Sequence, residues 1–294
     1  MFRLAALTLA LLGVGWAACG ALITWRLTRR AQPAFAEPAP ALAQDTLEEH
    51  RLVAADGLRV GAWLVRGAPG APCVLMLHGN GGARTSLRPL LEEFAAQGWC
   101  VLAVSLRAHG DSEGEVNDFG WSARQDVLAS VSFLEREAPD RPRVVFGTSL
   151  GAAAAIFASR EVGSRVQGYM LESPYRDLRT AVSNRLESRL WPGLDRLAFH
   201  ALWLFGDTLL PVPTERIRPL DHVADIPEDV PVLLLAGAKD RHAHLEEVEE
   251  LTQRISSHAR LEVFPEAAHG TLQRSEPERY QRLLFDFVHD RERR

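Results

Sequence analysis

Residues 143–158 read RVVFGTSLGAAAAIFA, and this stretch determines the fold that we expect. Its first four residues predict a short buried strand, and the residues after Gly151 predict a helix whose small side chains can pack against a sheet. The pattern G-x-S-x-G between the two is typical of a sharp strand-to-helix turn that exposes a serine hydroxyl. Ser149 would then lie at a helix N-terminus, where unpaired amides favour a developing negative charge. We therefore predict that Ser149 is a nucleophile.

A second copy of the pattern occurs at Gly110–Gly114, so the pentapeptide alone does not decide the matter. Its serine, Ser112, does not directly follow the apolar run 100–106, and the residues after it are acidic and polar. A helix of small residues is missing behind this copy. We therefore interpret Ser112 as a loop residue.

A glycine-rich turn follows another apolar run in residues 74–82, VLMLHGNGG. Glycine lets the main chain approach a reacting carbonyl group and direct an N–H at its oxygen. We expect the backbone N–H groups of Asn80 and Leu150 to form an oxyanion hole. The alternative is an ordinary turn between a strand and a helix, which often uses glycine.

Two further strand ends carry a carboxylate and an imidazole, in VPVLLLAGAKD at residues 230–240 and LEVFPEAAHG at residues 261–270. We expect Asp240 to orient His269, and His269 to take and return the proton of Ser149. Each has a simpler interpretation, because loop aspartates often form turns and the chain has 10 histidines. Glu172 is an alternative acid if replacement of Asp240 by Asn leaves activity intact.

Apolar runs and helical patterns alternate along the chain after a hairpin turned at Asp56 and Gly57. This alternation predicts an α/β fold with a mostly parallel central sheet that helices cover on both faces. Residues 174–227 interrupt the alternation and predict a helical cap insertion. Its apolar residues would shape a pocket for an acyl group, although plain helix packing explains them equally well.

From about residue 46 the chain resembles an α/β-hydrolase. It is similar to the branch that contains serine-aminopeptidase-like and monoacylglycerol-lipase-like hydrolases and membrane-associated acyl-protein thioesterases. The matching stretches are residues 78–81, 107–112, 147–151, 172–175, 237–240 and 269–270. Two departures are Ala108, where the branch usually has glycine, and the run His242–His244 after Asp240.

The resemblance implies a hydrolase that needs no cofactor. The cluster formed by Asp240, His242 and His244 could suggest a metal site, but we expect none there, because the triad already employs Asp240 and no further ligands converge. We expect these residues to begin a helix that runs to about Ile255 instead.

Leu4–Trp25 is apolar and uncharged, and about 20 such residues are enough to cross a bilayer. We predict a membrane anchor in residues 1–30, an Ala/Pro-rich linker in residues 31–45 and the hydrolase domain in residues 46–294. Cleavage after residues 34–36 and a lipoprotein site at Cys19 are alternatives. Arg26, Arg29 and Arg30 exceed the charge of Arg3 and the amino terminus by one, which slightly favours a cytoplasmic domain.

The formal net charge of −5 provides no basic patch for nucleic acid. Arginine almost replaces lysine, which occurs only at position 239, and this bias indicates a GC-rich bacterial genome. We expect Cys73 and Cys100 to be small buried residues on neighbouring strands rather than a disulfide. Neither the oligomeric state nor the residues that bind the substrate follow from the sequence.

These features favour a serine hydrolase that cleaves an ester or thioester, with an acyl or lipid-like substrate, through an acyl-enzyme intermediate. An amidase or peptidase with the same triad is the enzymatic alternative. A binding protein with this fold and no catalysis is the other alternative, but such a protein has no physical need for all three triad residues.

Overall fold

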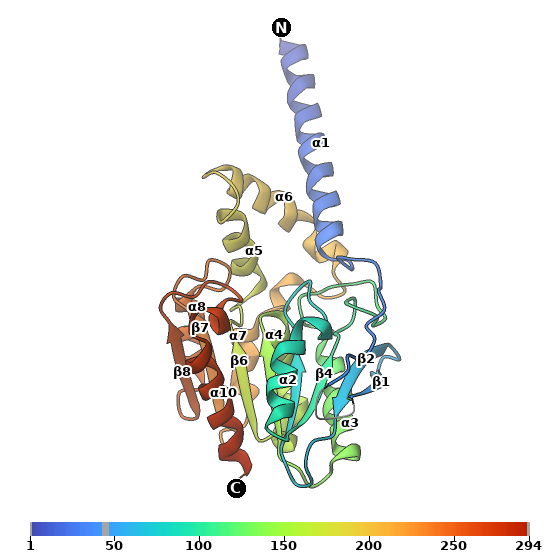
Figure 1. The fold of residues 1–294 in the computed structure, drawn as a ribbon. Coiled ribbons are helices and arrows are strands. Elements are labelled where there is room, and N and C mark those ends of the chain that lie inside the picture. The colour runs from blue at the N-terminus through green and yellow to red at the C-terminus, as the bar shows by residue number, and fades with distance from the viewer. Residues whose placement is uncertain (1, 43–46, 293–294) are drawn as a thin grey trace.

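The computed structural model describes residues 2–42 and 47–292. Within this part of the chain, eight strands form one sheet in the order β1-β2-β4-β3-β5-β6-β7-β8 (Figure 1). The hairpin β1–β2 is antiparallel, β2 pairs antiparallel with β4, and the other neighbours are parallel. The mostly parallel sheet is confirmed. The strands are β1 (Leu47–Val53), β2 (Arg59–Val65), β3 (Cys73–Leu77), β4 (Cys100–Val104), β5 (Arg143–Thr148), β6 (Gly168–Glu172), β7 (Val232–Gly237) and β8 (Ala259–Phe264).

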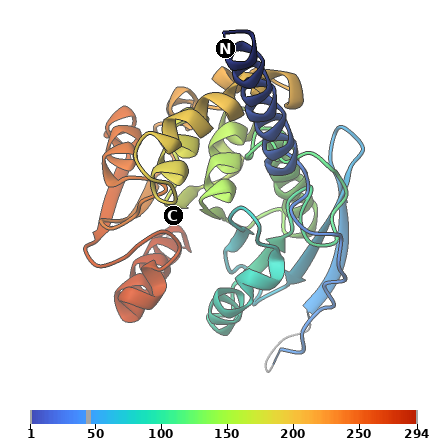
Figure 2. The ribbon, with the colours of Figure 1, turned by 90° about the horizontal axis from the view of Figure 1, so that it is seen from above.

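Helices cover both faces of the sheet, as predicted. One face carries α2 (Arg88–Ala96) and α10 (Pro277–Glu292), which lie on the same side of the sheet in Figure 2. The other face carries α3 (Arg124–Glu137), α4 (Leu150–Val162) and α8 (Leu245–Arg254). Three short elements connect strands and helices: η1 (Arg84–Leu87) between β3 and α2, η2 (Gly163–Arg165) between α4 and β6, and α9 (Leu272–Ser275) between β8 and α10.

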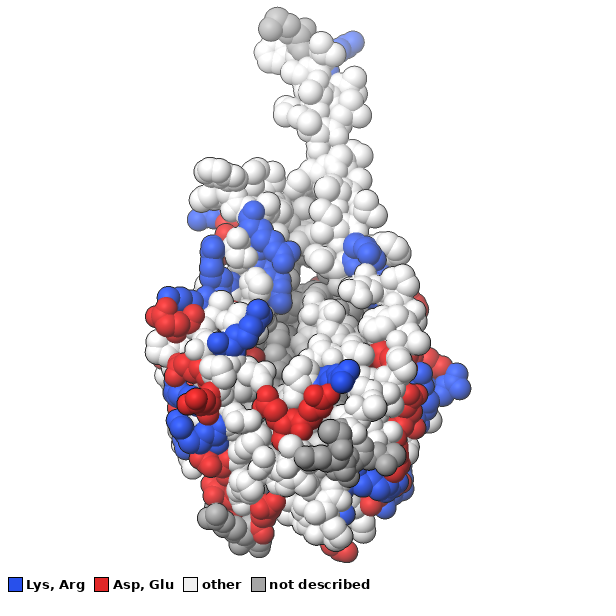
Figure 3. All heavy atoms as spheres, in the orientation of Figure 1, with Lys and Arg blue, Asp and Glu red and all other residues white. Residues whose placement is uncertain are grey.

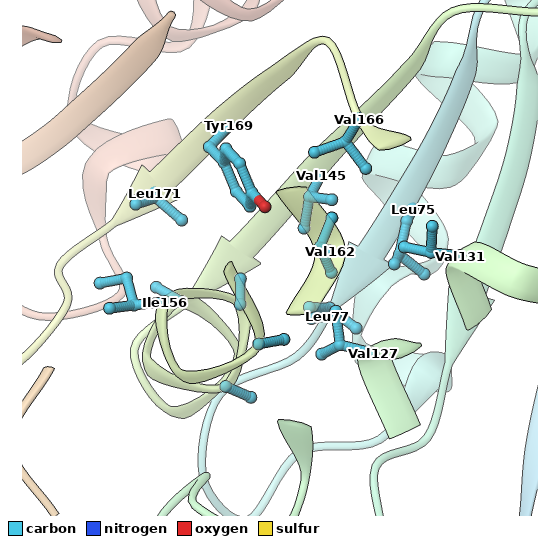
Figure 4. Close-up of a cluster of buried hydrophobic side chains, with 14 of the residues drawn as sticks. Leu75, Leu77, Val127, Val131, Val145, Ile156, Val162, Val166, Tyr169 and Leu171 are labelled. Carbon is cyan, nitrogen blue, oxygen red and sulfur yellow. The ribbon is translucent and has the colours of Figure 1, made fainter. Parts of the chain in front are cut away.

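The core explains why the central strands are almost continuously apolar, since helices cover both of their faces. Figure 4 shows part of the core on the α3/α4 face, where Leu75 lies beside Val131 of α3 and Val145 lies beside Val162 of α4. The alanines of α4 are buried and let this helix lie close to the sheet. Cys73 pairs in register with Cys100, and both are buried free thiols.

The predicted cap insertion follows β6 and consists mainly of α5 (Leu178–Glu187) and α6 (Leu194–Leu209). The short elements η3 (Thr214–Arg216), α7 (Pro219–His222) and η4 (Val223–Asp225) lead from it to β7. Figure 1 shows α5 and α6 above the edge at which the parallel strands end. The cap therefore lies over the edge where open parallel sheets bind their ligands.

The N-terminal helix α1 (Phe2–Leu27) is long and apolar enough to span a bilayer. It rises beside the cap, and most of its surface is exposed (Figure 1). The segment after α1 contacts the rest of the protein, because the buried Glu37 carboxylate accepts hydrogen bonds from Arg84, Ser105 and the backbone of Asp111. The predicted boundary at residues 45 and 46, and the chain ends at 1, 293 and 294, lie outside the described residues.

Candidate active site

Ser149 lies in the sharp turn that joins β5 to α4, with φ 51° and ψ −107°. The glycines on either side permit this turn because the chain leaves no room for a side chain. A Cβ on Gly151 would lie 2.4 Å from the carbonyl oxygen of Leu77, and one on Gly147 would lie 2.7 Å from the nitrogen of Ala152. The strained backbone holds the serine at the C-terminal edge of the sheet.

His269 joins the other two predicted triad residues. Its Nε2 lies 3.1 Å from Ser149 Oγ, and its Nδ1 lies 2.8 Å from Asp240 Oδ2. An ionised carboxylate only accepts hydrogen bonds, so the Nδ1 proton faces Asp240 and the Nε2 lone pair faces the serine hydroxyl. The three side chains thus come together from the ends of β5, β7 and β8, in a geometry that allows the imidazole to remove the serine proton.

Asp240 is held in place by its own loop. Its Oδ1 accepts hydrogen bonds from the backbone amides of His242 at 2.8 Å and Ala243 at 3.0 Å. Burial alone would raise the pKa of Asp240, but the hydrogen bond and charge of His269, together with these amides, lower it. The carboxylate therefore stays ionised, as an orienting partner of His269 must.

The same hydrogen bonds correct one expectation about this loop. Asp240 does not begin the following helix, since α8 starts at Leu245. The aspartate side chain bonds the amides two and three residues further on and so fixes a turn instead. His242 packs edge-on against the ring of His269, with centroids 5.1 Å apart. Across residues 2–42 and 47–292, His, Cys, Asp and Glu side chains form no group of three suited to a metal ion.

The predicted oxyanion loop adjoins the serine. A Cβ on Gly79 would lie 3.6 Å from Ser149 Cβ, so the turn that carries Asn80 passes close to the hydroxyl. Leu150 is the first residue of α4, where an amide has no partner within the helix. The Asn80 side chain accepts a hydrogen bond of 2.7 Å from Asn117, which the sequence analysis did not identify.

Two histidines brace this loop, and their roles were missed as well. His78 Nε2 accepts a hydrogen bond from the backbone of Leu106 at 3.0 Å, and His109 Nε2 accepts one from Gly81 at 3.2 Å. Burial, with the charge of His109, lowers the pKa of His78 to about 3, so its ring is neutral and able to accept. His78 follows β3 and His109 lies in the loop after β4, and these two strands are parallel neighbours. Their shared position at one edge of the sheet could have indicated that the two histidines lie close together.

The second pentapeptide has a different environment. Ser112 is buried, and its hydroxyl donates to the carbonyl oxygen of Ser105 at 2.5 Å and accepts from the amide of Gly61 at 2.8 Å. These bonds fasten the 107–114 loop to β2 and to the residue after β4. Both functions of the hydroxyl, donor and acceptor, are used within the protein.

Glu172, the alternative acid, ends β6 beside the elbow. Its backbone carbonyl accepts the amide of Ser149 at 2.8 Å, and its side chain accepts the hydroxyl of Tyr280 at 2.5 Å. Burial raises the pKa of Glu172. Its carboxyl group pairs with Tyr280, whereas the imidazole of His269 bonds Asp240.

Comparisons with known proteins identify the family of the chain. The model of the alpha/beta hydrolase family matches residues 74–282. An uncharacterized membrane protein of Saccharomyces cerevisiae is 24% identical over 229 residues, which cover 76% of this chain and 73% of the yeast protein. The human monoglyceride lipase is 34% identical over 128 residues, 42% of either chain.

Solved structures show the same fold. The esterase Pf2001 of Pyrococcus furiosus superposes with a TM-score of 0.72 and 23% identity, over 87% of this chain and 98% of the esterase. The superposition includes nearly the whole esterase. The residues matched by the family model include all three predicted triad residues. The chain therefore belongs to the alpha/beta hydrolase family.

Proposed function

We propose that the protein is a membrane-anchored serine hydrolase that cleaves a carboxylic ester or thioester through a covalent acyl-enzyme. The observation that carries the proposal is the continuous hydrogen-bonded chain from Asp240 through His269 to Ser149. The monoglyceride lipase among its relatives and the esterase that shares its fold support ester chemistry. The same likenesses support an acyl or lipid-like substrate.

In the first half of the proposed reaction, Ser149 Oγ attacks the carbonyl carbon of the substrate while its proton passes to His269 Nε2. The carbonyl π electrons move to oxygen, and the backbone N–H groups of Asn80 and Leu150 stabilise the resulting oxyanion. Asp240 stabilises the imidazolium that forms. When the tetrahedral intermediate collapses, His269 returns the proton to the leaving alcohol or thiol, and the acyl group remains on Ser149.

In the second half, water replaces the leaving group. His269 removes a proton from the water, the hydroxide attacks the acyl carbon, and a second tetrahedral intermediate forms in the same oxyanion hole. Its collapse expels Ser149 Oγ, which regains the proton from His269. The products are a carboxylic acid and the free enzyme, and every step uses groups of this chain and water.

Helix α1 would hold the enzyme at a membrane as a single span. Its length and apolar surface support this function, and a yeast relative is named as a membrane protein. The excess of one positive charge at the hydrolase end of α1 slightly favours a cytoplasmic catalytic domain. Extraction of the full chain from membranes by detergent, but not by alkaline carbonate, is the expected behaviour.

The substrate class can be tested with three compounds that share one acyl chain and differ only in the bond cleaved. The detergent-solubilised full chain is given a p-nitrophenyl ester, an alkyl thioester and a p-nitroanilide. We expect turnover of the ester and the thioester, with a burst of leaving group equal to the amount of enzyme when deacylation is slow. Ser149→Ala, the matched control, removes both burst and turnover.

The outcomes separate the alternatives. Cleavage of the anilide as fast as the ester would make the protein an amidase or peptidase. A folded wild-type protein that turns over none of the three compounds, and shows no burst with any of them, would contradict the enzymatic proposal.

A further inference from the structure

Helix α1 is part of the cap as well as a candidate anchor, because its C-terminal half packs on α6. Gly20 lies against Ala201 so closely that a Cβ on this glycine would be 2.5 Å from the Ala201 carbonyl oxygen. Two side chains of α1 also bond the backbone of α6. Trp16 Nε1 donates to the carbonyl of Leu197, and Thr24 Oγ1 to that of Leu202, each at 3.1 Å. The residues Trp16, Gly20 and Thr24 recur every fourth position and so share one helix face.

The level of these contacts along α1 fixes the depth of α6 if α1 crosses a bilayer. A helix rises about 1.5 Å per residue, so Gly20 lies roughly 7.5 Å, and Trp16 roughly 13.5 Å, from the end of the apolar run at Trp25. The hydrocarbon core is about 30 Å thick and takes about 20 residues. The part of α1 before Trp16 spans only about 21 Å at the same rise, which is too short to cross alone. The α1–α6 contacts must therefore lie below the membrane surface.

The surface of the cap has the chemistry that this depth requires. Leu194, Leu197 and Leu204 of α6 are 54%, 51% and 60% exposed, and Trp191 just before α6 is 80% exposed. The three leucines lie on one side of α6 together with Ala201, the residue that meets α1. Large apolar side chains gathered on one surface usually mark a contact with a protein or a membrane.

Polar side chains of α6 lie on a different exposed side, which carries Arg196, His200 and Asp207. An apolar side next to a polar one is typical of a helix that lies in the membrane interface, with its apolar side about 5–10 Å deep. Figure 3 shows the middle of α1 and the top of the cap without charge. Basic groups lie at the far end of α1, at its base and below the top of the cap. Long basic side chains such as Arg196 can extend from a buried helix toward the lipid phosphates.

We propose that residues 190–204 insert into the interfacial layer of the bilayer that α1 crosses, with the leucine side of α6 among the lipid acyl chains. This inference rests on the proposed membrane anchor. The leucine side of α6 would contact lipid of the leaflet nearest the hydrolase domain, because the contact with α1 places α6 at that depth. The cap would then be mounted on the membrane, over the edge of the sheet that carries the triad.

The segment after α1 supports a fixed placement rather than a loose tether. The Arg30 side chain donates to the carbonyl oxygens of Gly110 and Gly114, at 3.1 Å and 3.0 Å, in the loop that braces the oxyanion turn. Glu37 then makes its buried ion pair with Arg84, at 3.1 Å. Helix α1 is therefore in contact with the cap through α6, and the segment after α1 is in contact with the hydrolase domain.

The test places an environment-sensitive fluorophore, NBD, on single cysteines of the full chain in phosphatidylcholine/phosphatidylglycerol nanodiscs. The background is Cys19→Ser, since Cys73 and Cys100 are buried. The probe positions are Leu194→Cys on the leucine side of α6, His200→Cys on its polar side, and Val14→Cys in the free part of α1. Quenching is measured with doxyl-labelled phosphatidylcholine and with aqueous iodide.

We expect doxyl lipid to quench the probes at positions 14 and 194 severalfold more than the probe at 200, and iodide to show the opposite order. A probe at 194 that iodide quenches as strongly as the probe at 200, while the probe at 14 stays in lipid, would overturn this inference and leave the anchor standing. A probe at 14 that iodide reaches would overturn the anchor and this inference together. A probe at 194 shielded from both quenchers would mean that a second copy of the chain covers the leucine side, which also contradicts the proposal.

Discussion

The two G-x-S-x-G segments of this chain have the same pattern and different structures. Ser149 follows β5 directly, takes a φ of 51° and meets His269 at 3.1 Å. Ser112 lies in a loop after β4, and its hydroxyl is bonded to the backbone of Ser105 and Gly61. The difference shows that the turn between a strand and a closely packed helix brings the serine hydroxyl to the imidazole of His269. The pentapeptide alone does not.

The second loop nevertheless serves the first. His109, two residues after Arg107, accepts the amide of Gly81, and Asn117 bonds the side chain of Asn80. The 107–117 segment thus holds the turn from which the proposed oxyanion hole is built. In this account Ser149 performs the chemistry, whereas Ser112 fixes the loop that supports it.

The largest contrast is expected from alanine at each serine. Ser149→Ala should lower ester turnover by about 10⁴-fold to 10⁶-fold, because the nucleophile is lost. Ser112→Ala should keep turnover within a few fold and cost about 1–3 kcal/mol of unfolding free energy, since the buried Gly61 amide loses its acceptor. Turnover of the p-nitrophenyl ester and urea unfolding in detergent measure both. Equal loss of activity in the two variants would contradict the assignment of Ser149 as the nucleophile and Ser112 as a structural residue.

A similar contrast is expected between two carboxylates close to Ser149. Asp240→Asn should lower kcat by about 10⁴-fold, because the amide no longer fixes the imidazole tautomer. Glu172→Gln should leave kcat within about tenfold, as the side chain of Glu172 bonds Tyr280. The pre-steady-state and steady-state rates of the two variants decide between them. A reversed order would make Glu172 the acid of the triad.

The glycines that close the two pentapeptides should also differ. A Cβ at position 151 would be 2.4 Å from the carbonyl oxygen of Leu77, whereas the nearest atom to one at position 114 is 3.3 Å away. Gly151→Ala should cost about 3 kcal/mol or more and reduce turnover, since β3 and the oxyanion turn must move. Gly114→Ala should cost about 1–2 kcal/mol for its positive φ and keep turnover. Thermal unfolding together with ester turnover checks the pair, and a Gly151→Ala enzyme with wild-type activity would contradict the expected close packing.

The last effect concerns the dependence of stability on pH, and it involves the neutral histidine that ties the two regions together. Burial lowers the pKa of His78 from an ordinary 6.5 to about 3, so the unfolded chain binds more protons than the folded chain within this pH window. The contribution of His78 to stability is present above about pH 6.5 and decreases by up to about 1.4 kcal/mol per unit as the pH falls toward 3.

The variant His78→Gln, which has no titrating group at this position, should show a shallower dependence on pH than the wild type. Urea unfolding at pH 7, 6, 5 and 4 gives both slopes. Parallel curves would mean that His78 is not the buried neutral group described above.

The sequence predicted the sheet, the cap and the position of Ser149 because these follow from local patterns. Apolar runs mark buried strands, and the small residues of α4 mark the helix that packs behind the elbow. The supporting contacts were not predictable in the same way. The hydrogen bond from Asn117 to Asn80 spans 37 residues, and the buried ion pair of Glu37 with Arg84 spans 47, so neither leaves a periodic signal.

The packing of α1 on α6 illustrates the same limit. The first segment was expected to be an apolar helix and the second to be part of an amphipathic helical cap, but their contact joins residues 181 positions apart, from Trp16 to Leu197. An apolar run indicates that a helix is buried or lies in lipid, and it does not indicate which partner covers each face. Only the three-dimensional structure brings α1 and the cap together.

The central claim is that Ser149, and not Ser112, is the activated nucleophile. The direct measurement is to label the full chain with a fluorophosphonate, digest it and locate the adduct by tandem mass spectrometry. The account predicts an adduct on the peptide that contains Ser149, and no labelling in His269→Ala. An adduct on Ser112, or none on the folded wild-type protein, would contradict it.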